Sequence, residues 1–210
     1  MRIRNKPWAM DYLKENGHIV DTEMNYKNKV KQFFDTDQPL QIEIGTGMGT
    51  FITELAEKNP DINYLGIELD KNIIIRVVEK IIEMDLKNIR LVLLDANYIS
   101  DYLGEGEVSK IYLNFSDPWP KTRHARRRLT YHTFLKQYHH LLNDEGSLQF
   151  KTDNRGLFEF SLKSMNEYGM KFDEIILDLH DEEPEDNIRT EYEEKFSKNG
   201  SRIYFLKASF

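Results

Sequence analysis

Apolar runs and amphipathic stretches alternate along the chain from Leu40 to its end. The apolar runs predict seven strands, at 40–44, 62–69, 89–95, 110–115 and 147–152, then near 172–179 and 202–208. The amphipathic stretches predict helices that end at about Lys58 and that span 71–84, about 130–142, about 155–168 and about 190–196. Residues 1–38 are polar and weakly patterned, which predicts an N-terminal extension with short helices.

This alternation predicts an α/β fold, because strands that alternate with helices form right-handed crossovers in one sheet. The run 89–95 is too evenly apolar for a half-exposed strand and is expected in the middle of a parallel sheet. We therefore predict a doubly wound, mostly parallel, seven-stranded sheet with helices on both faces. One domain is expected over 1–210, with the extension at 1–38 and the α/β core at 39–210. Ligands of such sheets bind beyond the carboxyl ends of the strands, where the strand order reverses.

Composition narrows the possible chemistry. The chain has 210 residues and no cysteine, which excludes disulfides, thiolate metal sites and cysteine nucleophiles and is typical of a reducing cytosol. Its histidines are scattered, so we expect no metal. It contains no run of 18 apolar residues, and no apolar signal core follows its basic start, so we expect a soluble cytoplasmic protein without a membrane span. The formal net charge of −7 should repel nucleic acid, so any basic strip must act locally.

A glycine-rich turn, E-I-G-T-G-M-G-T at 43–50, joins the first strand of the core to a helix. We expect Gly45, Gly47 and Gly49 where the backbone approaches a ligand, although a turn needed only for packing stays open. A dinucleotide fingerprint requires a small residue at position 50, where this chain has Thr50. Glu43 would repel a pyrophosphate but suits a cationic ligand, which favours S-adenosylmethionine over NAD.

Acidic residues also end the next three strands. Glu68 follows Gly45 by 23 residues, close to the roughly 20-residue spacing expected for an acid that binds ribose hydroxyls. Asp70, which opens the next helix, is expected to be its N-cap. Asp95 and Ala96 could hydrogen-bond an adenine amine, or Asp95 could be a solvated strand-end acid. Together with Asp117, these acids indicate a ligand site at the carboxyl edge.

The run S-D-P-W-P-K-T-R-H-A-R-R-R-L at 116–129 combines an acid with a cationic strip. Because a residue before proline is restricted to extended conformations, Asp117 and Trp119 are expected in a rigid, extended turn. The strip would hold the phosphates of an anionic polymer, with an incidental solvated loop as the alternative. Its expected RNA-binding residues are Arg123, His124, Arg126, Arg127 and Arg128, after Lys121.

Two further motifs lie near the C-terminus. Asp153, in K-T-D-N at 151–154, precedes a predicted helix, and a ligand contact and a helix cap are equally open for it. The sequence T-E-Y-E at 190–193 has the S/T-x-x-E pattern of a capping box, which leaves a base contact by Tyr192 possible.

These motifs resemble the bacterial tRNA (guanine-N7-)-methyltransferase family over about residues 40–208. E-I-G-x-G-x-G, G-I-E-L and L-L-D-A are general to class I methyltransferases with a Rossmann-like fold, whereas the run around Asp117 and R-T-E-Y-E-x-K-F at 189–196 are specific to this family. The resemblance implies S-adenosylmethionine bound through Glu43, Glu68, Asp95 and Asp117. It also implies methylation of the guanine at position 46 of the tRNA variable loop. The implied guanine and tRNA contacts come from Lys121, Asp153, Thr190, Glu191, Tyr192 and Glu193.

The reaction requires alignment more than proton transfer. Guanine N7 carries a free lone pair in the neutral base, so we assign Asp117 as the orienting and electrostatic catalytic residue and not as a general base. Alternatives are an RNA methyltransferase that acts on an exocyclic amine, a non-catalytic tRNA-binding protein and, more distantly, an NAD oxidoreductase. The chain is expected to act as a monomer or a homodimer.

Overall fold

The computed structural model describes residues 5–181, 183–184, 187–197 and 200–210, so residues 1–4 of the predicted extension lie outside the described residues. The strands are β1 (Val20–Asp21), β2 (Leu40–Ile44), β3 (Asn63–Glu68), β4 (Ile89–Leu93), β5 (Val108–Asn114), β6 (Leu142–Thr152), β7 (Lys171–Ile176) and β8 (Tyr204–Ser209). The α-helices are α1 (Ala9–Glu15), α2 (Thr50–Lys58), α3 (Lys71–Glu83), α4 (Ile99–Tyr102), α5 (His132–Leu141), α6 (Arg155–Tyr168) and α7 (Glu191–Ser197). Short 3-10 helices are η1 (Val30–Phe33), η2 (Ala96–Tyr98) and η3 (Thr122–Arg127).

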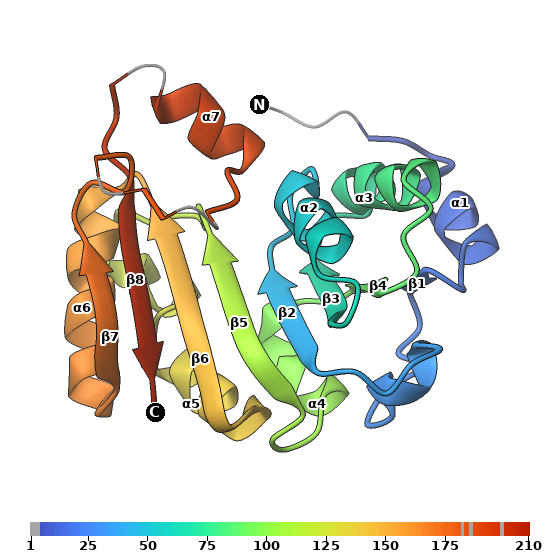
Figure 1. Cartoon of the computed structure of the whole chain (residues 1–210), viewed down its shortest axis with the longest axis horizontal. Helices are drawn as coiled ribbons and strands as arrows, with labels where there is room; N and C mark the ends of the chain where they lie inside the picture. Colours follow the sequence, from blue (N-terminus) through green and yellow to red (C-terminus); the bar gives the residue numbers. More distant parts are fainter. Residues whose placement is uncertain (1–4, 182, 185–186, 198–199) are drawn as a thin grey trace.

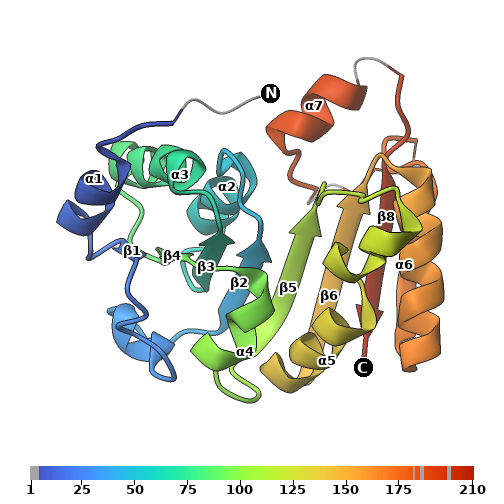
Figure 2. The ribbon, with the colours of Figure 1, turned by 180° about the vertical axis from the view of Figure 1, so that it is seen from behind.

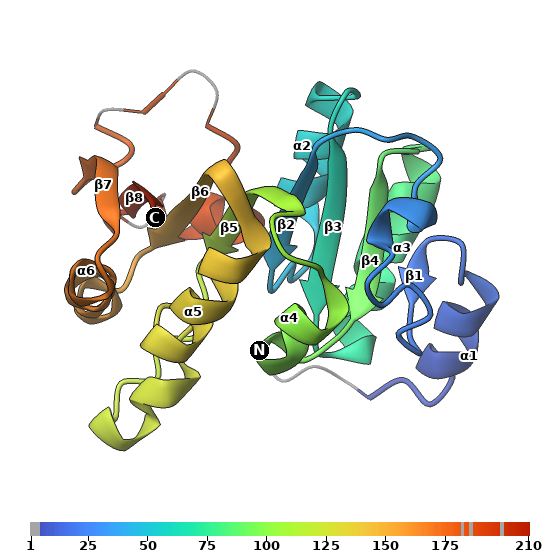
Figure 3. The same cartoon turned by 90° about the horizontal axis from the view of Figure 1, so that it is seen from below.

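The strands form one sheet in the order β1-β4-β3-β2-β5-β6-β8-β7. All neighbouring pairs are parallel except those of β8, which runs antiparallel to both β6 and β7. Helices α1, α2 and α3 cover one face over β4, β3 and β2, and α4, α5 and α6 cover the other face (Figures 1 and 2). The view from below separates these layers (Figure 3). The predicted doubly wound, mostly parallel sheet is confirmed.

The structure adds an eighth strand, β1, that the sequence pattern did not predict. β1 has only two residues and pairs with β4 at the edge of the sheet. The buried Asp21 carboxylate accepts hydrogen bonds from the backbone N–H groups of Asn25 and Tyr26 and, at 2.8 Å, from the Tyr102 hydroxyl. A strand this short has no periodicity to detect, and it is held by side-chain contacts from elsewhere in the chain.

Helix α3 shows how the apolar stripe meets the sheet. Ile74, Val77, Val78 and Ile81 are almost completely buried, whereas Ile82 is half exposed. The amphipathic helix predicted over 71–84 is therefore confirmed, and its apolar side reaches the surface at Ile82, as expected for a helix with 3.6 residues per turn on one face of a sheet. Asp70 is the N-cap of α3, as predicted, and accepts a hydrogen bond from the Asn72 N–H at 2.7 Å.

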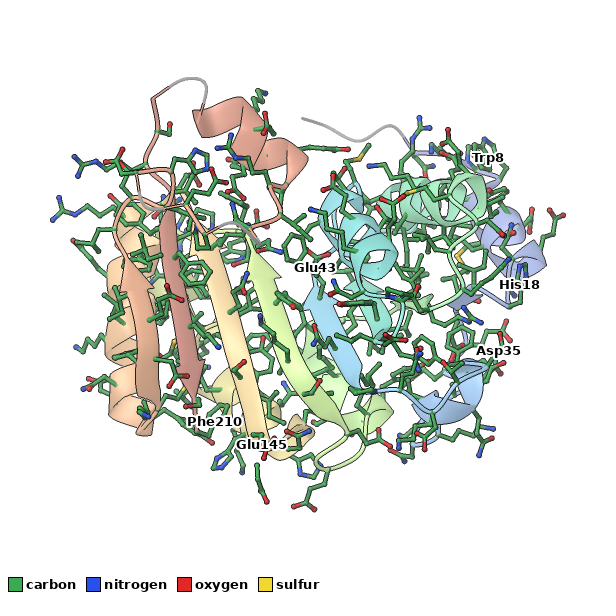
Figure 4. All side chains as sticks on the ribbon, viewed as in Figure 1. Trp8, His18, Asp35, Glu43, Glu145 and Phe210 are labelled. Carbon is green, nitrogen blue, oxygen red and sulfur yellow. The ribbon has the colours of Figure 1, made fainter. Side chains whose placement is uncertain are left out.

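The strand order reverses between β2 and β5, because β2 pairs with β3 on one side and with β5 on the other. Parallel strands place all their carboxyl ends at one edge, and a crevice opens where neighbouring crossovers diverge to opposite faces. Glu43 lies at this edge, at the end of β2, whereas Glu145 and Phe210 lie at the opposite edge (Figure 4). Helix α7 lies beyond the carboxyl ends of β5 and β6 (Figure 1). No helix in the described part of the chain has the length and apolar character needed to cross a membrane.

Gly49 provides a test of the packing between α2 and α3. It has φ +85°, and a Cβ added there would lie 2.8 and 2.9 Å from the two Val77 methyl carbons. Gly106 also has a positive φ, +64°, but a Cβ added there would meet nothing within 4 Å. Both Ala substitutions strain the backbone, but only Gly49→Ala also overpacks the core. We expect Gly49→Ala to lower the free energy of unfolding by about 1–3 kcal/mol more than Gly106→Ala, measured by urea denaturation. Equal losses for the two variants would contradict this role of Gly49.

Candidate active site

Two cavities meet at Gly45 on the carboxyl edge of the sheet. The first, of about 520 Å³, lies over the ends of β3, β4 and β5, and the second, of about 410 Å³, lies between the glycine turn, β5 and α7. The first is lined by Gly45, Glu68, Asp95, Ala96, Asn97, Asp117, Trp119, Arg126 and Arg127, among others. The second is lined by Glu43, Gly45, Gly47, Asn114, Phe115, Thr190, Glu191, Tyr192 and Lys195, among others. The four predicted strand-end acids are thus divided between two adjoining cavities.

Glu43 is buried at the reversal of strand order. Its Oε1 accepts a hydrogen bond from the Asn114 side-chain amide at 2.9 Å, which joins β2 to β5. Burial raises the pKa of Glu43 to about 8, although the Asn114 hydrogen bond and the positive charge of Lys151 act against the shift. Its Oε2 has no hydrogen-bond partner among the described residues, and neither has Asn114 Oδ1. Buried polar atoms without partners are unusual in folded proteins, so these two mark a place for a ligand that donates hydrogen bonds.

The three glycines of the turn have different roles. Gly45 and Gly47 have φ values of +83° and +52°, and a Cβ at either would meet nothing within 4 Å. Their backbone therefore faces open space in the two cavities, consistent with the expected approach to a ligand. Gly49 also lines the second cavity, and in addition its missing Cβ makes room for Val77 of α3.

Glu68 is held in place by the backbone of the loops around it. Its Oε2 accepts a hydrogen bond from the Gly47 N–H at 3.1 Å, and its Oε1 accepts from the N–H groups of Leu69 and Asp70 at 2.9 and 3.0 Å. Burial raises the pKa of Glu68, and these three hydrogen bonds oppose the shift. Glu68 therefore orders the glycine turn while it lines the first cavity.

Asp95 caps the short helix η2 at the end of β4. Its Oδ1 accepts hydrogen bonds from the backbone N–H and side-chain amide of Asn97, at 2.9 and 2.7 Å. This cap turns the backbone so that Asp95 and Ala96 line the first cavity beside Glu68.

The turn after β5 does not have the fully extended backbone that its two prolines led us to expect. Asp117 is exposed and lines the first cavity. Trp119 was expected to be extended, but that prediction is wrong: its φ is +41°, in the left-handed region. The Arg128 guanidinium donates hydrogen bonds to the carbonyl oxygens of Pro118 and Trp119, at 3.1 and 3.0 Å, and lies over the Phe160 ring. Contacts from outside the turn thus override the local preference of the residue before proline.

Most of the cationic strip lies in the short helix η3, and its side chains make different contacts. Arg128, expected to bind RNA, also holds the turn through its hydrogen bonds to the Pro118 and Trp119 carbonyls. Arg127 lies over the Trp119 ring, with 4.6 Å from its guanidinium carbon to the ring centroid, and His124 contacts the edge of the same ring. Arg126 and Arg127 line the first cavity. The side chains of Lys121, Arg123, Arg126 and Arg127 are exposed, which leaves a cationic surface next to Asp117.

The predicted capping box at 190–193 is confirmed. The Glu193 N–H donates to Thr190 Oγ at 2.9 Å, and the Thr190 N–H donates to Glu193 Oε2 at 3.4 Å. Glu193 was expected to contact the substrate, but its side chain is completely buried and forms an ion pair with Lys151. Glu191 was given the same role; its Oε1 accepts hydrogen bonds from Lys80 of α3 and Thr50 of α2, at 2.8 and 2.5 Å. The structure therefore assigns Glu193 to fixing α7, whereas Glu191 both anchors α7 and lines the second cavity.

Tyr192 lines the second cavity, and the Asp153 carboxylate acts on it electrostatically. The Tyr192 ring lies 5.0 Å from the Phe115 ring, measured between centroids. Burial and the negative charges of Asp153 and Asp117 raise the pKa of Tyr192. The N-cap of α6 is Asn154, whose Oδ1 accepts from the Leu157 N–H at 2.8 Å, so Asp153 is not the cap.

Three residues of the site were not predicted from the sequence. Asn114 and Phe115 end the apolar run 110–115, and the polar Asn114 at that position was a signal that could have been used. Lys151 is a charge within a predicted buried strand, which is equally unusual. The role of each depends on a partner from a distant part of the chain, and that partner cannot be identified from the sequence alone.

Comparisons with known proteins identify the family of the chain. Residues 37–206 match a family model described as "Putative methyltransferase". The chain is 56% identical to the tRNA (guanine-N(7)-)-methyltransferase of Staphylococcus carnosus and 55% identical to that of Macrococcus caseolyticus, in both cases over 100% of each chain. It is 57% identical to the corresponding enzyme of Staphylococcus aureus strain JH9, over 100% of this chain and 98% of the relative.

Solved structures share the fold at low sequence identity. An antibiotic-related methyltransferase gives a TM-score of 0.65 at 18% identity, over 86% of this chain and 92% of the other. The fibrillarin of Aeropyrum pernix, solved with natively bound S-adenosyl-L-methionine, gives 0.55 at 16% identity, over 82% and 66% of the two chains. Together, the family model and the full-length identities above 50% show that the chain belongs to the tRNA (guanine-N7-)-methyltransferase family.

Proposed function

We propose that this protein transfers the methyl group of S-adenosylmethionine to N7 of guanine in tRNA, at position 46 of the variable loop. The observation that carries the proposal is the pair of cavities joined at Gly45. Carboxylates line both cavities, and an exposed cationic strip borders the first. A positively charged small ligand fits among the carboxylates, whereas a polyanion fits the strip outside.

The chain's residues fit S-adenosylmethionine. The unpaired Glu43 Oε2 and Asn114 Oδ1 are acceptors that a ligand ammonium group can satisfy. Glu68 keeps an unused lone pair on Oε2, which accepts only from the Gly47 N–H, and can accept there from a ribose hydroxyl. Asp95 and Ala96 border the space for an adenine ring. The open backbone at Gly45 and Gly47 allows the ligand to pass between the two cavities.

The chemistry needs orientation and a negative field. When bound, S-adenosylmethionine supplies an electrophilic methyl group on a sulfonium. Guanine N7 already has a lone pair, so no residue has to remove a proton before attack. The acids can stabilise positive charge during transfer, and only the part that is stronger in the transition state raises the rate. We assign Asp117 to orienting the reacting groups, because it is exposed at the cavity beside the strip.

Carboxylates near α7 are suited to the recognition of guanine. The Watson–Crick edge of guanine presents N–H donors at N1 and N2, which a carboxylate such as Asp153 can accept. Tyr192 and Phe115 offer aromatic surface in the second cavity. N7 is hard to reach within a helix, so the base has to leave its stack before methylation. The exposed Lys121, Arg123, Arg126 and Arg127 would hold the phosphates around that base.

Asp117 is tested by methyl transfer. We expect Asp117→Ala to lower kcat/KM for unmodified tRNA by about 100-fold, because the reacting groups lose their alignment. The measurement is transfer of label from S-adenosylmethionine, with nuclease digestion to identify the product as 7-methylguanosine. Asp144→Ala, at the opposite edge of the sheet, should match the wild type. Wild-type rates for Asp117→Ala would refute its assignment, and a product methylated at an exocyclic amine would refute the proposed reaction.

Glu43 is tested by proton release. Because its pKa is about 8 in the free protein, Glu43 is mostly protonated at pH 7, and a cationic ligand would favour its ionised form. Binding of S-adenosylmethionine at pH 7 should release about one more proton from the wild type than from Glu43→Gln. Wild-type affinity should therefore rise with pH up to about 8 and then level off. Isothermal titration in buffers of different ionisation enthalpy measures this release, with Glu145→Gln as the control. Identical release from wild type and Glu43→Gln would show that Glu43 does not meet the ligand.

Arg126 is tested by the salt dependence of tRNA binding. Loss of one phosphate contact should lower the slope of log K against log salt by about one unit. Arg126→Ala is preferred to Arg127→Ala because Arg127 also packs on Trp119. Lys163→Ala, an exposed residue of α6 paired with Glu167, serves as the matched loss of one charge. If both variants keep the wild-type slope, the strip does not bind phosphates.

A further inference from the structure

Lys151, at the carboxyl end of β6, is a charged residue with no exposed side-chain surface. Its Nζ donates to Glu193 Oε2 at 2.7 Å, to the Ile188 carbonyl oxygen at 2.8 Å and to Asn187 Oδ1 at 3.1 Å. An ammonium group has three protons, so these acceptors use all of them. All three acceptors belong to residues 187–193, the segment that leads into α7.

The positive charge of Lys151 makes the position of residues 187–193 depend on these contacts. Burial lowers the pKa of Lys151, and the Glu193 carboxylate opposes the shift, as do Glu43 and Glu183. The ammonium group also lies over the Phe51 ring, 5.1 Å from its centroid. A buried charge that loses its partner is strongly destabilising. Any movement of residues 187–193 away from β6 would leave the Lys151 charge buried without a partner. The observed position of the segment is therefore favoured over positions farther from β6.

The hydrogen bonds of Glu193 connect Lys151 to the residues that line the second cavity. Its Oε1 accepts from the Asn187 side-chain amide at 3.1 Å and lies 3.1 Å from His180 Nε2. Its Oε2, which holds Lys151, also accepts from the Thr190 N–H, and Thr190 Oγ accepts from the Glu193 N–H. With Glu193 directed inward, Thr190 and Tyr192 line the second cavity, and Tyr192 meets Phe115.

We propose that Lys151 is a positioning residue of the methyl transfer: its ion pair with Glu193 fixes residues 187–193 beyond the carboxyl ends of β5 and β6, so that Thr190 and Tyr192 form the wall against which the target base is held. This inference rests on the proposed methylation of tRNA. It separates residues that hold the wall, Lys151 and Glu193, from residues that present it to the substrate. The position of α7 beyond the strand ends is visible in Figure 1.

Three variants test the proposal: Lys151→Met, Glu193→Met and the double variant. Each single variant leaves one buried charge unpaired and should lower the melting temperature, whereas the double variant should recover much of that loss because no lone charge remains. We expect kcat/KM for tRNA to fall about 100-fold in all three. The Kd of Glu193→Met for S-adenosylmethionine should stay within about threefold of the wild type, because the acceptors proposed for the ligand ammonium group, Glu43 Oε2 and Asn114 Oδ1, belong to β2 and β5 and not to residues 187–193. Lys163→Met, on the exposed face of α6, is the control.

Activity and stability should therefore separate in the double variant. Recovery of wild-type kcat/KM together with the melting temperature would show a merely structural pair and would overturn the proposal. A parallel loss of tRNA turnover and cofactor affinity in Glu193→Met would also overturn it.

Hydrogen exchange gives a readout that does not depend on activity. Backbone amides of residues 187–197 should exchange at least about tenfold faster in the three variants than in the wild type or Lys163→Met. Unchanged protection in this segment would overturn the positioning role whatever the enzyme does. A wild type that fails to methylate tRNA would refute the proposed function, while the exchange result would still decide whether Lys151 anchors the segment.

Discussion

The buried ammonium group of Lys151 is the constraint on which the carboxyl edge of this sheet depends. It is completely enclosed, and it is compensated by the Glu193 carboxylate at 2.7 Å. Compensating a buried charge requires partners at fixed positions. Residues 187–193 supply them, which brings α7, a late element of the chain, against the glycine turn that follows the first strand of the core.

Topology brings the remaining groups to the same place. Because the strand order reverses between β2 and β5, the end of each strand borders a crevice, and Glu43 reaches Asn114 across it. The acids there do not share one role. Glu68 and Asp95 order the surrounding backbone through N–H groups, whereas Glu43 keeps an oxygen without a partner in the described structure. A site arranged in this way can accept a positive charge without rearranging its loops, which favours a reaction that moves a positive charge from sulfur to a base.

The errors of sequence-based prediction share one cause. Gly49, Arg128 and Glu193 have the residue types expected of ligand-binding positions, and each has a partner in the fold that the sequence did not indicate: Val77, the Pro118–Trp119 carbonyls and Lys151 respectively. A sequence motif contains two groups of residues: those that contact a ligand and those that hold the contacting residues in position. Only a partner's position separates the two groups, and that partner is tens of residues away in the chain for Gly49 and Glu193.

The sequence by itself determined the strands of the core and its helices other than α4, their doubly wound arrangement, the four acids at strand ends and the capping box at 190–193. These follow from local periodicity, turn chemistry and the rule that parallel strands end at one edge. Tertiary structure alone decided the two-residue β1, the left-handed Trp119, the division of the edge into two cavities and the burial of Lys151 with Glu193. Each of these depends on a contact between distant segments, whose free energy is absent from any local stretch of the chain.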